Sequence, residues 1–217
     1  MRGSLFIMTP VQKVITASEM RELDRRTTAE CGIHSLLLME AAARASVQQL
    51  TQHFACGIAG KSVLILCGRG NNGGDGAAVA RQLALLGAHV SVALFASVEE
   101  SQGDARTNFE IIRSLAELDD LSFTTCRTVE EWEQFQASQQ DCDVIVDALF
   151  GTGLTRPLAG IHAAAVEFIE KQRGCLKVAL DLPSGLDADR AEPIGPAVRA
   201  DVTVTFTAPK PANVLPP

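Results

Sequence analysis

The residues with the clearest chemical use form a glycine-rich turn, and phosphate binding is the chemistry that such a turn supports. Residues 68–76 read Gly-Arg-Gly-Asn-Asn-Gly-Gly-Asp-Gly, between the apolar run 62–67 and the helix-forming run 77–86. Glycines allow a sharp turn and a close approach to a ligand, and free N–H groups at a helix N-terminus favour negative charge. The turn therefore predicts a phosphate cradle; the alternative is a structural turn capped by Asp75.

Two further strand ends carry carboxylates. Asp147 lies near the end of the apolar run 143–148, Asp181 ends the run 176–181, and a Gly-containing turn follows each. A carboxylate at the end of a buried strand is unfavourable unless it is paired. Either Asp alone could cap a neighbouring helix. Two of them, at the same sheet edge as the cradle, favour a ligand site.

The turn also matches the dinucleotide fingerprint G-x-G-x-x-G, which is a weak signal by itself. The fingerprint expects an acidic residue about 20 positions later, at the end of the next strand. Here the predicted strand 89–95 is followed by an Ala-Ser pair, and Glu99 and Glu100 come later, as expected for solvated loop charges. Asp75 would also repel a pyrophosphate in the usual position. The pattern therefore disfavours a standard NAD-dependent dehydrogenase.

The elements that must position these residues alternate between strand and helix from residue 61 onward. Strands are predicted at 62–67, 89–95, 121–125, 143–148, 176–181 and 202–206, and helices at 74–86, 102–117, 128–138 and 161–172. Continuous apolar strands that alternate with helices indicate a parallel sheet with helices on both faces. Two helices precede the sheet, at 19–30 with Ser18 as its cap and at 35–54. The tail 211–217 is predicted to be a loop.

Composition limits the class of protein. The 217 residues, 47% of them hydrophobic, predict one domain with a sizeable core, and the net charge of −7 argues against nucleic-acid and acidic-membrane partners. Six cysteines without a C-x-x-C pair predict buried, reduced thiols in a cytoplasmic protein, and the scattered histidines lack metal-ligand spacing. Apolar runs are too short for a membrane helix or a signal peptide, and Met8 is an alternative start.

Four motifs in order resemble the NAD(P)HX epimerase family, and the resemblance covers nearly the whole chain. The motifs are Gly70 to Gly76 with Ala80-Arg81, Asp147 to Gly153, Asp181 to Gly185, and Ala208 to Pro211. Such enzymes interconvert the two configurations of hydrated NADH or NADPH, so that an ADP- or ATP-dependent dehydratase can restore the cofactor. The resemblance implies a Rossmann-like three-layer α/β/α sandwich with a mostly parallel sheet. It also implies a homodimer and a dehydratase partner, often fused to the C-terminal side.

Carried over position by position, the resemblance implies a set of site residues. Substrate contacts are expected from Asn71, Asn72, Gly73, Gly74 and Asp75, from Gly151, Thr152, Gly153, Leu154, Thr155, Arg156 and Pro157, and from Asp181. A potassium ion is expected among Asn72, Asp147 and Ser184, whose oxygens suit a hard cation. Asp181 is expected to stabilise a cationic ring and handle a proton, with Lys210 as its partner, which would donate to the departing hydroxyl or hold phosphate. The alternative for Lys210 is a surface lysine between two prolines.

Two features depart from the family pattern. Ala41 stands where members commonly have a polar residue, so any ligand contact from that side chain is absent. The chain stops at Pro217, where relatives continue, which predicts a truncated or separately expressed epimerase portion within a single domain, 1–217. The rival function is a non-catalytic scaffold, as in decapping-enhancer proteins of this fold. The intact run 71–75 with both carboxylates argues against it, and nothing in the sequence separates NADHX from NADPHX.

Overall fold

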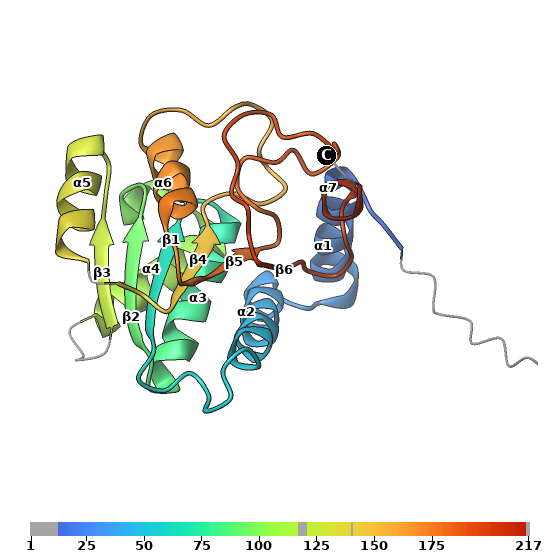
Figure 1. The fold of residues 1–217 in the computed structure, drawn as a ribbon. Helices are drawn as coiled ribbons and strands as arrows, with labels where there is room; N and C mark the ends of the chain where they lie inside the picture. The colour runs from blue at the N-terminus through green and yellow to red at the C-terminus, as the bar shows by residue number, and fades with distance from the viewer. Residues whose placement is uncertain (1–12, 117–120, 140, 216–217) are drawn as a thin grey trace, which may run out of the picture.

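Six parallel strands form the centre of the molecule (Figure 1). The computed structural model describes residues 13–116, 121–139 and 141–215. The strands lie in the order β3-β2-β1-β4-β5-β6, and every neighbouring pair is parallel. Their bounds are Ser62–Cys67 (β1), His89–Leu94 (β2), Leu121–Thr125 (β3), Val144–Ala148 (β4), Leu176–Leu180 (β5) and Val202–Val204 (β6). All six predicted strands are confirmed: β1 and β3 have the predicted bounds, and each of the other four differs at one end by one or two residues.

Helices cover both faces of this sheet. On one face, α2 (Ser35–Thr51), α3 (Asn71–Leu85) and α4 (Gly103–Leu115) share a core with the strands. On the other face, α5 (Val129–Ser138) and α6 (Gly160–Lys171) pack through residues that include Trp132 and Ile169. The predicted three-layer α/β/α architecture is confirmed. The strands are buried on both faces, which is why they read as continuous apolar runs.

The first helix, α1 (Ala17–Cys31), is capped by Thr16 and not by Ser18, so the predicted cap is wrong. The Thr16 hydroxyl accepts the Glu19 amide over 3.2 Å, and the Glu19 carboxylate accepts the Thr16 amide over 2.8 Å. This reciprocal capping box satisfies two N–H groups that a helix leaves free. Glu19 lies three residues after Thr16, and this spacing selects Thr16 as the cap.

Helix α3 starts at Asn71, three residues before the predicted start at 74. Glycine is a poor helix former, but close approach requires it here. A Cβ on Gly73 would lie 1.7 Å from the carbonyl oxygen of Gly68, and one on Gly76 would lie 2.6 Å from Cβ of Ala148. The glycine-rich turn is therefore the first part of the helix itself, which packs directly against β1 and β4.

The C-terminal tail contains a short helix, α7 (Pro211–Val214), where a loop was predicted. The Asn213 side chain accepts the Lys210 amide over 2.8 Å, and the Ala212 amide donates to the Ala188 carbonyl over 3.0 Å. The Ile15 amide also donates to the Pro209 carbonyl over 3.0 Å, so the segments before α1 and α7 lie side by side (Figure 1). These contacts anchor the chain around Lys210.

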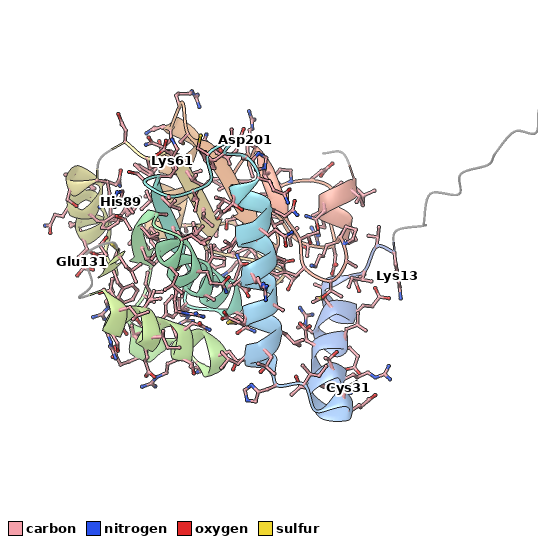
Figure 2. The ribbon with its side chains drawn as sticks, turned by 90° about the horizontal axis from the view of Figure 1, so that it is seen from below. Lys13, Cys31, Lys61, His89, Glu131 and Asp201 are labelled. Atoms are coloured by element: carbon pink, nitrogen blue, oxygen red, sulfur yellow. The ribbon has the colours of Figure 1, made fainter. Side chains whose placement is uncertain are left out.

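The amino-terminal edge of the sheet is closed by its own side chains, and Figure 2 looks onto this edge. The Asp143 carboxylate accepts the Lys61 ammonium and the Ser62 amide, both over 2.9 Å. These two contacts hold the pKa of Asp143 below its usual range. The Asp201 carboxylate accepts the Lys177 amide over 2.8 Å. The backbone amides of Ser62 and Lys177, at the starts of β1 and β5, are thus satisfied by side chains of the protein itself.

The six cysteines are free thiols, but burial is uneven. Cys67 and Cys126 are buried, and Cys142 and Cys175 are half-buried, whereas Cys31 and Cys56 are exposed, against the prediction of buried thiols.

No helix in the described ranges is long and apolar enough to span a bilayer. The predicted start at Met8, the domain limits 1 and 217, and position 117 lie outside the described residues.

Candidate active site at the carboxyl edge

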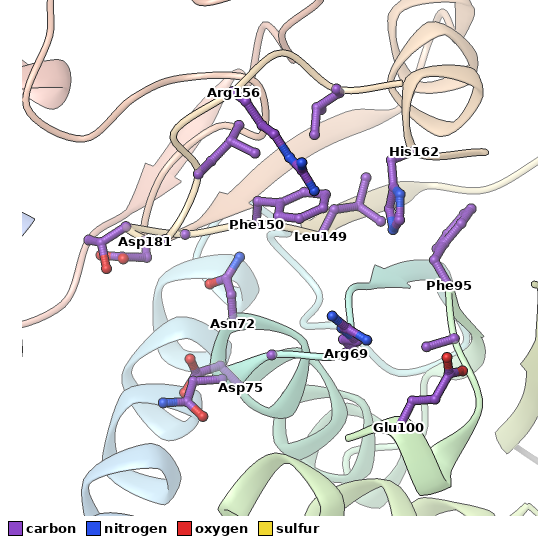
Figure 3. A pocket seen from close by; sticks show the side chains of 18 of the residues that line it. Arg69, Asn72, Asp75, Phe95, Glu100, Leu149, Phe150, Arg156, His162 and Asp181 are labelled. Atoms are coloured by element: carbon purple, nitrogen blue, oxygen red, sulfur yellow. The ribbon is translucent and has the colours of Figure 1, made fainter. Parts of the chain in front are cut away.

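A cavity of about 1330 Å³ lies at the carboxyl ends of the strands (Figure 3). The strand order reverses direction between β1 and β4, and ligands of open parallel sheets bind at such switch points. The cavity lining carries most of the predicted substrate residues: Asn71, Asn72, Asp75, Gly151, Thr152, Gly153, Leu154, Arg156, Pro157 and Asp181.

Three of the predicted contact residues do not line this cavity. Gly73 and Gly74 are buried in the first turn of α3, and Thr155 lies in a shallow groove beside Pro193 and Ile194. The N-cap residue of α3 is Gly70, which has no side chain that could bond to the first N–H groups of the helix. The first N–H groups of α3 therefore have no cap from a protein side chain, and they can bind an anion in the cavity.

Asp75 lies in the second turn of α3, because the helix starts at Asn71. Asp75 is therefore not the cap residue of this helix, and it still lines the cavity beside Asn71 and Asn72. Burial raises the pKa of Asp75 well above its usual value, and the nearby carboxylates Asp181 and Asp24 raise it further. Burial also raises the pKa of Asp24, a residue of α1 that lines the same cavity. Asp75 is thus a carboxyl group that holds its proton at unusually high pH.

Asp181 and Lys210 form a buried ion pair beside the cavity. The Lys210 ammonium donates to Asp181 Oδ1 over 2.5 Å, to the Phe206 carbonyl over 3.0 Å and to the Thr205 hydroxyl over 3.2 Å. Lys210 has no exposed surface, whereas Asp181 lines the cavity. All three ammonium protons are thus used within the protein. Lys210 lies behind Asp181 and is not a surface lysine.

Two strained turns hold this pair in place. Asp181 has a φ of 62° and Thr207 a φ of 63°. At each turn the following amide donates to the preceding carbonyl over 2.7 Å. A γ-turn with positive φ is a rare and strained conformation, which costs about 1–3 kcal/mol. Strain of this size persists where the surrounding structure fixes the geometry, and here it directs the Asp181 carboxylate toward the cavity.

Asp147 and Ser184 lie together beneath the cavity. Asp147 accepts the Ser184 hydroxyl over 2.6 Å, the Ser184 amide over 2.7 Å and the Leu149 amide over 3.2 Å. Burial raises the pKa of Asp147 to about 6, although these hydrogen bonds oppose the rise. The Ser184 hydroxyl also accepts the Phe150 amide over 3.0 Å. The ends of β4 and β5 are therefore joined through Asp147 and Ser184.

Asn72 is one of the buried polar side chains without a partner among the described residues, as are Ser101 through its hydroxyl and Trp132 through its ring N–H. Both its amide oxygen and its amide nitrogen are buried without a hydrogen-bond partner in the described part of the chain. Its side chain reaches toward Gly151, where a Cβ would lie 3.4 Å from Asn72 Cγ and 3.0 Å from Asp181 Oδ2. A buried amide without partners is unfavourable by about 1–3 kcal/mol. This arrangement is typical of a group that a ligand or ion satisfies.

Several cavity residues were not predicted from the sequence. Arg69, Phe95, Arg127 and His162 line the cavity, and Glu100, predicted to be a solvated loop charge, lines it as well. Each of them lies at or beyond the carboxyl end of a strand, or on the helix that follows β4. These residues could have been identified from the sequence by their position directly after a predicted strand.

The fold and the cavity define a parallel α/β domain with a ligand site at its topological switch point. Residues 35–212 match the family described as YjeF-related protein N-terminus. The chain therefore belongs to this family, as the sequence motifs predicted.

Named relatives support this assignment. The chain is 40% identical over 204 residues to the bifunctional NAD(P)H-hydrate repair enzyme Nnr of Moorella thermoacetica, covering 94% of this chain and 38% of that protein. It is 37% identical over 196 residues to the NAD(P)H-hydrate epimerase of Limosilactobacillus reuteri, covering 89% and 84% of the two chains. The crystal structure of yeast ynu0 matches with a TM-score of 0.78 and 26% identity, over 93% of this chain and 83% of that one.

Proposed function

We propose that this chain epimerises hydrated NADH or NADPH. The relatives at 37% and 40% identity are named for an epimerase and for a bifunctional repair enzyme acting on this hydrate. The observation that carries the proposal is the position of Asp181. Its carboxylate bonds to Lys210, its backbone has a positive φ, and it lines a large cavity that also contains the uncapped N-terminus of α3. A cavity of about 1330 Å³ has room for a dinucleotide.

The chemistry is redox-neutral. The hydroxyl of the hydrated ring takes a proton and leaves as water, and the C–O bond electrons leave with it. The ring remains as an iminium-like cation. Water then adds to the opposite face and returns the proton. Asp181 is the group that stabilises the cation, because Oδ1 is bonded to Lys210 and Oδ2 lies near the cavity loop at Gly151. Lys210 acts as a positioning residue, since its ammonium is buried behind Asp181.

A potassium ion fits the donor set beneath the cavity. Asn72 offers a buried amide oxygen without a partner, and Asp147 and Ser184 add carboxylate and hydroxyl oxygens. Oxygen donors of this kind suit a hard cation. The described residues contain no cluster of three or more His, Cys, Asp or Glu side chains that could hold a metal ion. When bound, the ion would supply positive charge that favours ionised Asp147 and an anionic substrate.

The reaction implies a partner that consumes one configuration of the hydrate. We propose that an NAD(P)HX dehydratase fills this role, because the chain spans 38% of a relative named as bifunctional. The six free thiols support a reducing compartment, which we propose to be the cytoplasm. Assembly as a homodimer stays a prediction from the family resemblance.

The test supplies a mixture of the two hydrate configurations and a purified dehydratase that consumes one of them. We expect the second configuration to disappear at a rate proportional to the amount of this protein. Consumption at the spontaneous rate, with or without the protein, would overturn the enzyme proposal. Steady oxidation of NADH with a carbonyl substrate would indicate a dehydrogenase instead.

A further inference from the structure

Charged side chains line the cavity along its length. Asp24, Asp75 and Asp181 lie at one end, on α1, α3 and the end of β5. Arg69 and Arg127 line the cavity beyond the ends of β1 and β3. Figure 3 shows Asp75 and Asp181 on one side and Arg69 on the other. Arg21, Arg156, Glu100 and Glu131 line the cavity as well, and Asp181 is already paired with Lys210. The feature that distinguishes the end near β1 and β3 is therefore its two guanidinium groups.

The guanidinium groups of Arg69 and Arg127 have no hydrogen bond or ion pair with the described residues. The nearest carboxylates are already used by the backbone. Glu100 accepts the Ser97 amide over 2.7 Å, and Glu131 accepts the Arg127 amide over 2.5 Å. The Glu100 contact belongs to the capping box of the short helix Val98–Glu100, and Glu131 also accepts the Thr128 amide over 3.3 Å in the capping box of α5. The carboxylates lower the positive potential without pairing with the arginine side chains.

His162 does not add charge at this end. Burial and the nearby Arg69 lower its pKa below the usual value for histidine. Its ring packs against Phe150 with centroids 5.0 Å apart and against Phe95 with centroids 5.9 Å apart. The arginine end of the cavity therefore combines an apolar ring wall with two guanidinium groups.

The sheet fixes the separation of the two ends. β5 and β3 are four strand positions apart, and spacings of about 4.8 Å place their ends about 19 Å apart. The uncapped N-terminus of α3 lies between them, after β1. A dinucleotide with its hydrated ring at Asp181 and its pyrophosphate at α3 therefore extends its adenosine toward β2 and β3.

The end of β2 lacks the acidic residue that holds an adenosine ribose 2′-hydroxyl, since Ala96 stands there. An arginine near this point accommodates a 2′-phosphate instead. We propose that Arg69 and Arg127 bind the 2′-phosphate of the substrate, so that this protein prefers hydrated NADPH over hydrated NADH. This inference rests on the proposed function for the orientation of the dinucleotide.

The test compares binding of 2′-phospho-ADP-ribose and ADP-ribose by calorimetry at one fixed ionic strength. Two charge-assisted contacts predict that the phosphorylated ligand binds about 10- to 100-fold more tightly. Arg69→Ala, Arg127→Ala and the double variant should remove this preference and leave ADP-ribose affinity nearly unchanged. Arg44→Ala, an exposed arginine on α2, is the matched control and should keep it. Both cavity arginines are exposed, so the variants should fold, as thermal melts would check.

Equal affinity of the wild-type protein for the two ligands would overturn the inference. An equal loss of both affinities in the variants would also overturn it, because the arginines would then bind the shared pyrophosphate. Binding needs no turnover, so a failed epimerase assay with an intact 2′-phosphate preference would refute the proposed function alone. Active enzyme without that preference would refute this inference alone.

Discussion

The two edges of one sheet treat their polar groups in opposite ways. At the amino-terminal edge, Asp143 and Asp201 accept strand-start amides, and Lys61 completes an ion pair with Asp143. At the carboxyl edge, the Asn72 amide is buried without a partner among the described residues, α3 has no side-chain cap, and Asp181 sits in a strained turn. The amino-terminal edge contributes to the fold, while the carboxyl edge leaves groups for a ligand.

The unsatisfied and strained groups of the carboxyl edge lower the stability of the folded protein. An unpaired buried amide and two positive-φ turns are each unfavourable by about 1–3 kcal/mol. Natural domains keep such features where function needs them and satisfy local rules elsewhere. Changes at the carboxyl edge should therefore alter activity or ligand-linked stability, whereas changes at the amino-terminal edge should alter stability alone.

The largest effect should come from Asp181→Asn. The change removes the charge that we propose stabilises the cationic ring, so turnover should fall about 10²–10⁴-fold with the fold intact. The matched change at the other edge, Asp143→Asn, should leave turnover near wild type and lower stability by no more than about 1 kcal/mol, since that pair is partly exposed. Hydrate epimerisation and thermal melts measure both. Equal turnover losses at the two edges would remove the contrast.

Lys210→Met should be the most destabilising single change at the carboxyl edge. It leaves the Asp181 carboxylate without its buried partner, a loss of about 3–5 kcal/mol in the free energy of unfolding. The double variant Asp181→Asn/Lys210→Met should recover part of this loss, because neither charge then remains. Denaturant unfolding of the three variants gives the coupling energy. Additive losses would argue that the pair does not act as a unit.

Potassium should stabilise the protein by mass action, by about 2.7 kcal/mol at a hundredfold excess over its Kd. The three oxygen-bearing residues Asn72, Asp147 and Ser184 come from separate strand ends, so the cavity size they set should favour potassium over lithium. Melts in potassium, sodium and lithium chloride at equal ionic strength separate binding from screening. Asp147→Ala should abolish the potassium gain. Identical melts in all three salts would leave the ion site without support.

Asp75→Asn should stabilise the protein at neutral pH, because the variant has no buried carboxyl group to ionise. Burial and the carboxylates Asp181 and Asp24 raise the folded-state pKa of Asp75, so its contribution to stability is present at low pH. That contribution is lost as the pH rises from about 3.9 through the raised value. The advantage of the variant should therefore grow with pH across this window. Thermal melts from pH 4 to pH 8 check the sign, and an advantage that shrinks with pH would contradict it.

The smallest effect concerns thiol labelling. Cys31 and Cys56 are exposed and should react with iodoacetamide in the native protein. Burial raises the pKa of Cys126 to about 11 and of Cys142 to about 12, so these thiols should stay protonated and react slowly at pH 8. Mass spectrometry of labelled peptides gives the order. Rapid labelling of Cys126 would show that the α5 side of the core opens readily.

The strands and the layer arrangement could be predicted from the sequence because doubly buried strands leave continuous apolar runs. The start of α3 could not, since only the contact of Gly73 with Gly68 explains a glycine there. The helix α7 was missed because four residues show no period, and the bond from Ala212 to Ala188 that holds it is formed between distant segments.

The candidate site was predictable where motifs are continuous in sequence. The carboxylates Asp147 and Asp181 follow apolar runs, and both lie where the sequence placed them, at the ends of β4 and β5. Arg69 and Arg127 are far apart in the chain, and only the strand order β3-β2-β1 brings them to one end of the cavity. The two strained turns depend on tertiary contacts and leave no mark in composition.

The most direct test of the central claim uses one purified hydrate configuration in ¹⁸O-labelled water, with no second enzyme present. We expect wild-type protein to form the other configuration at a rate proportional to its concentration. The label should enter the hydroxyl at least as fast as the configuration changes, because solvent water can add to either face of the cation. Asp143→Asn should behave like wild type, and Asp181→Asn should lose nearly all of the acceleration. Interconversion at the spontaneous rate with wild-type protein, or the same rate with and without Asp181, would contradict an active site at the carboxyl edge.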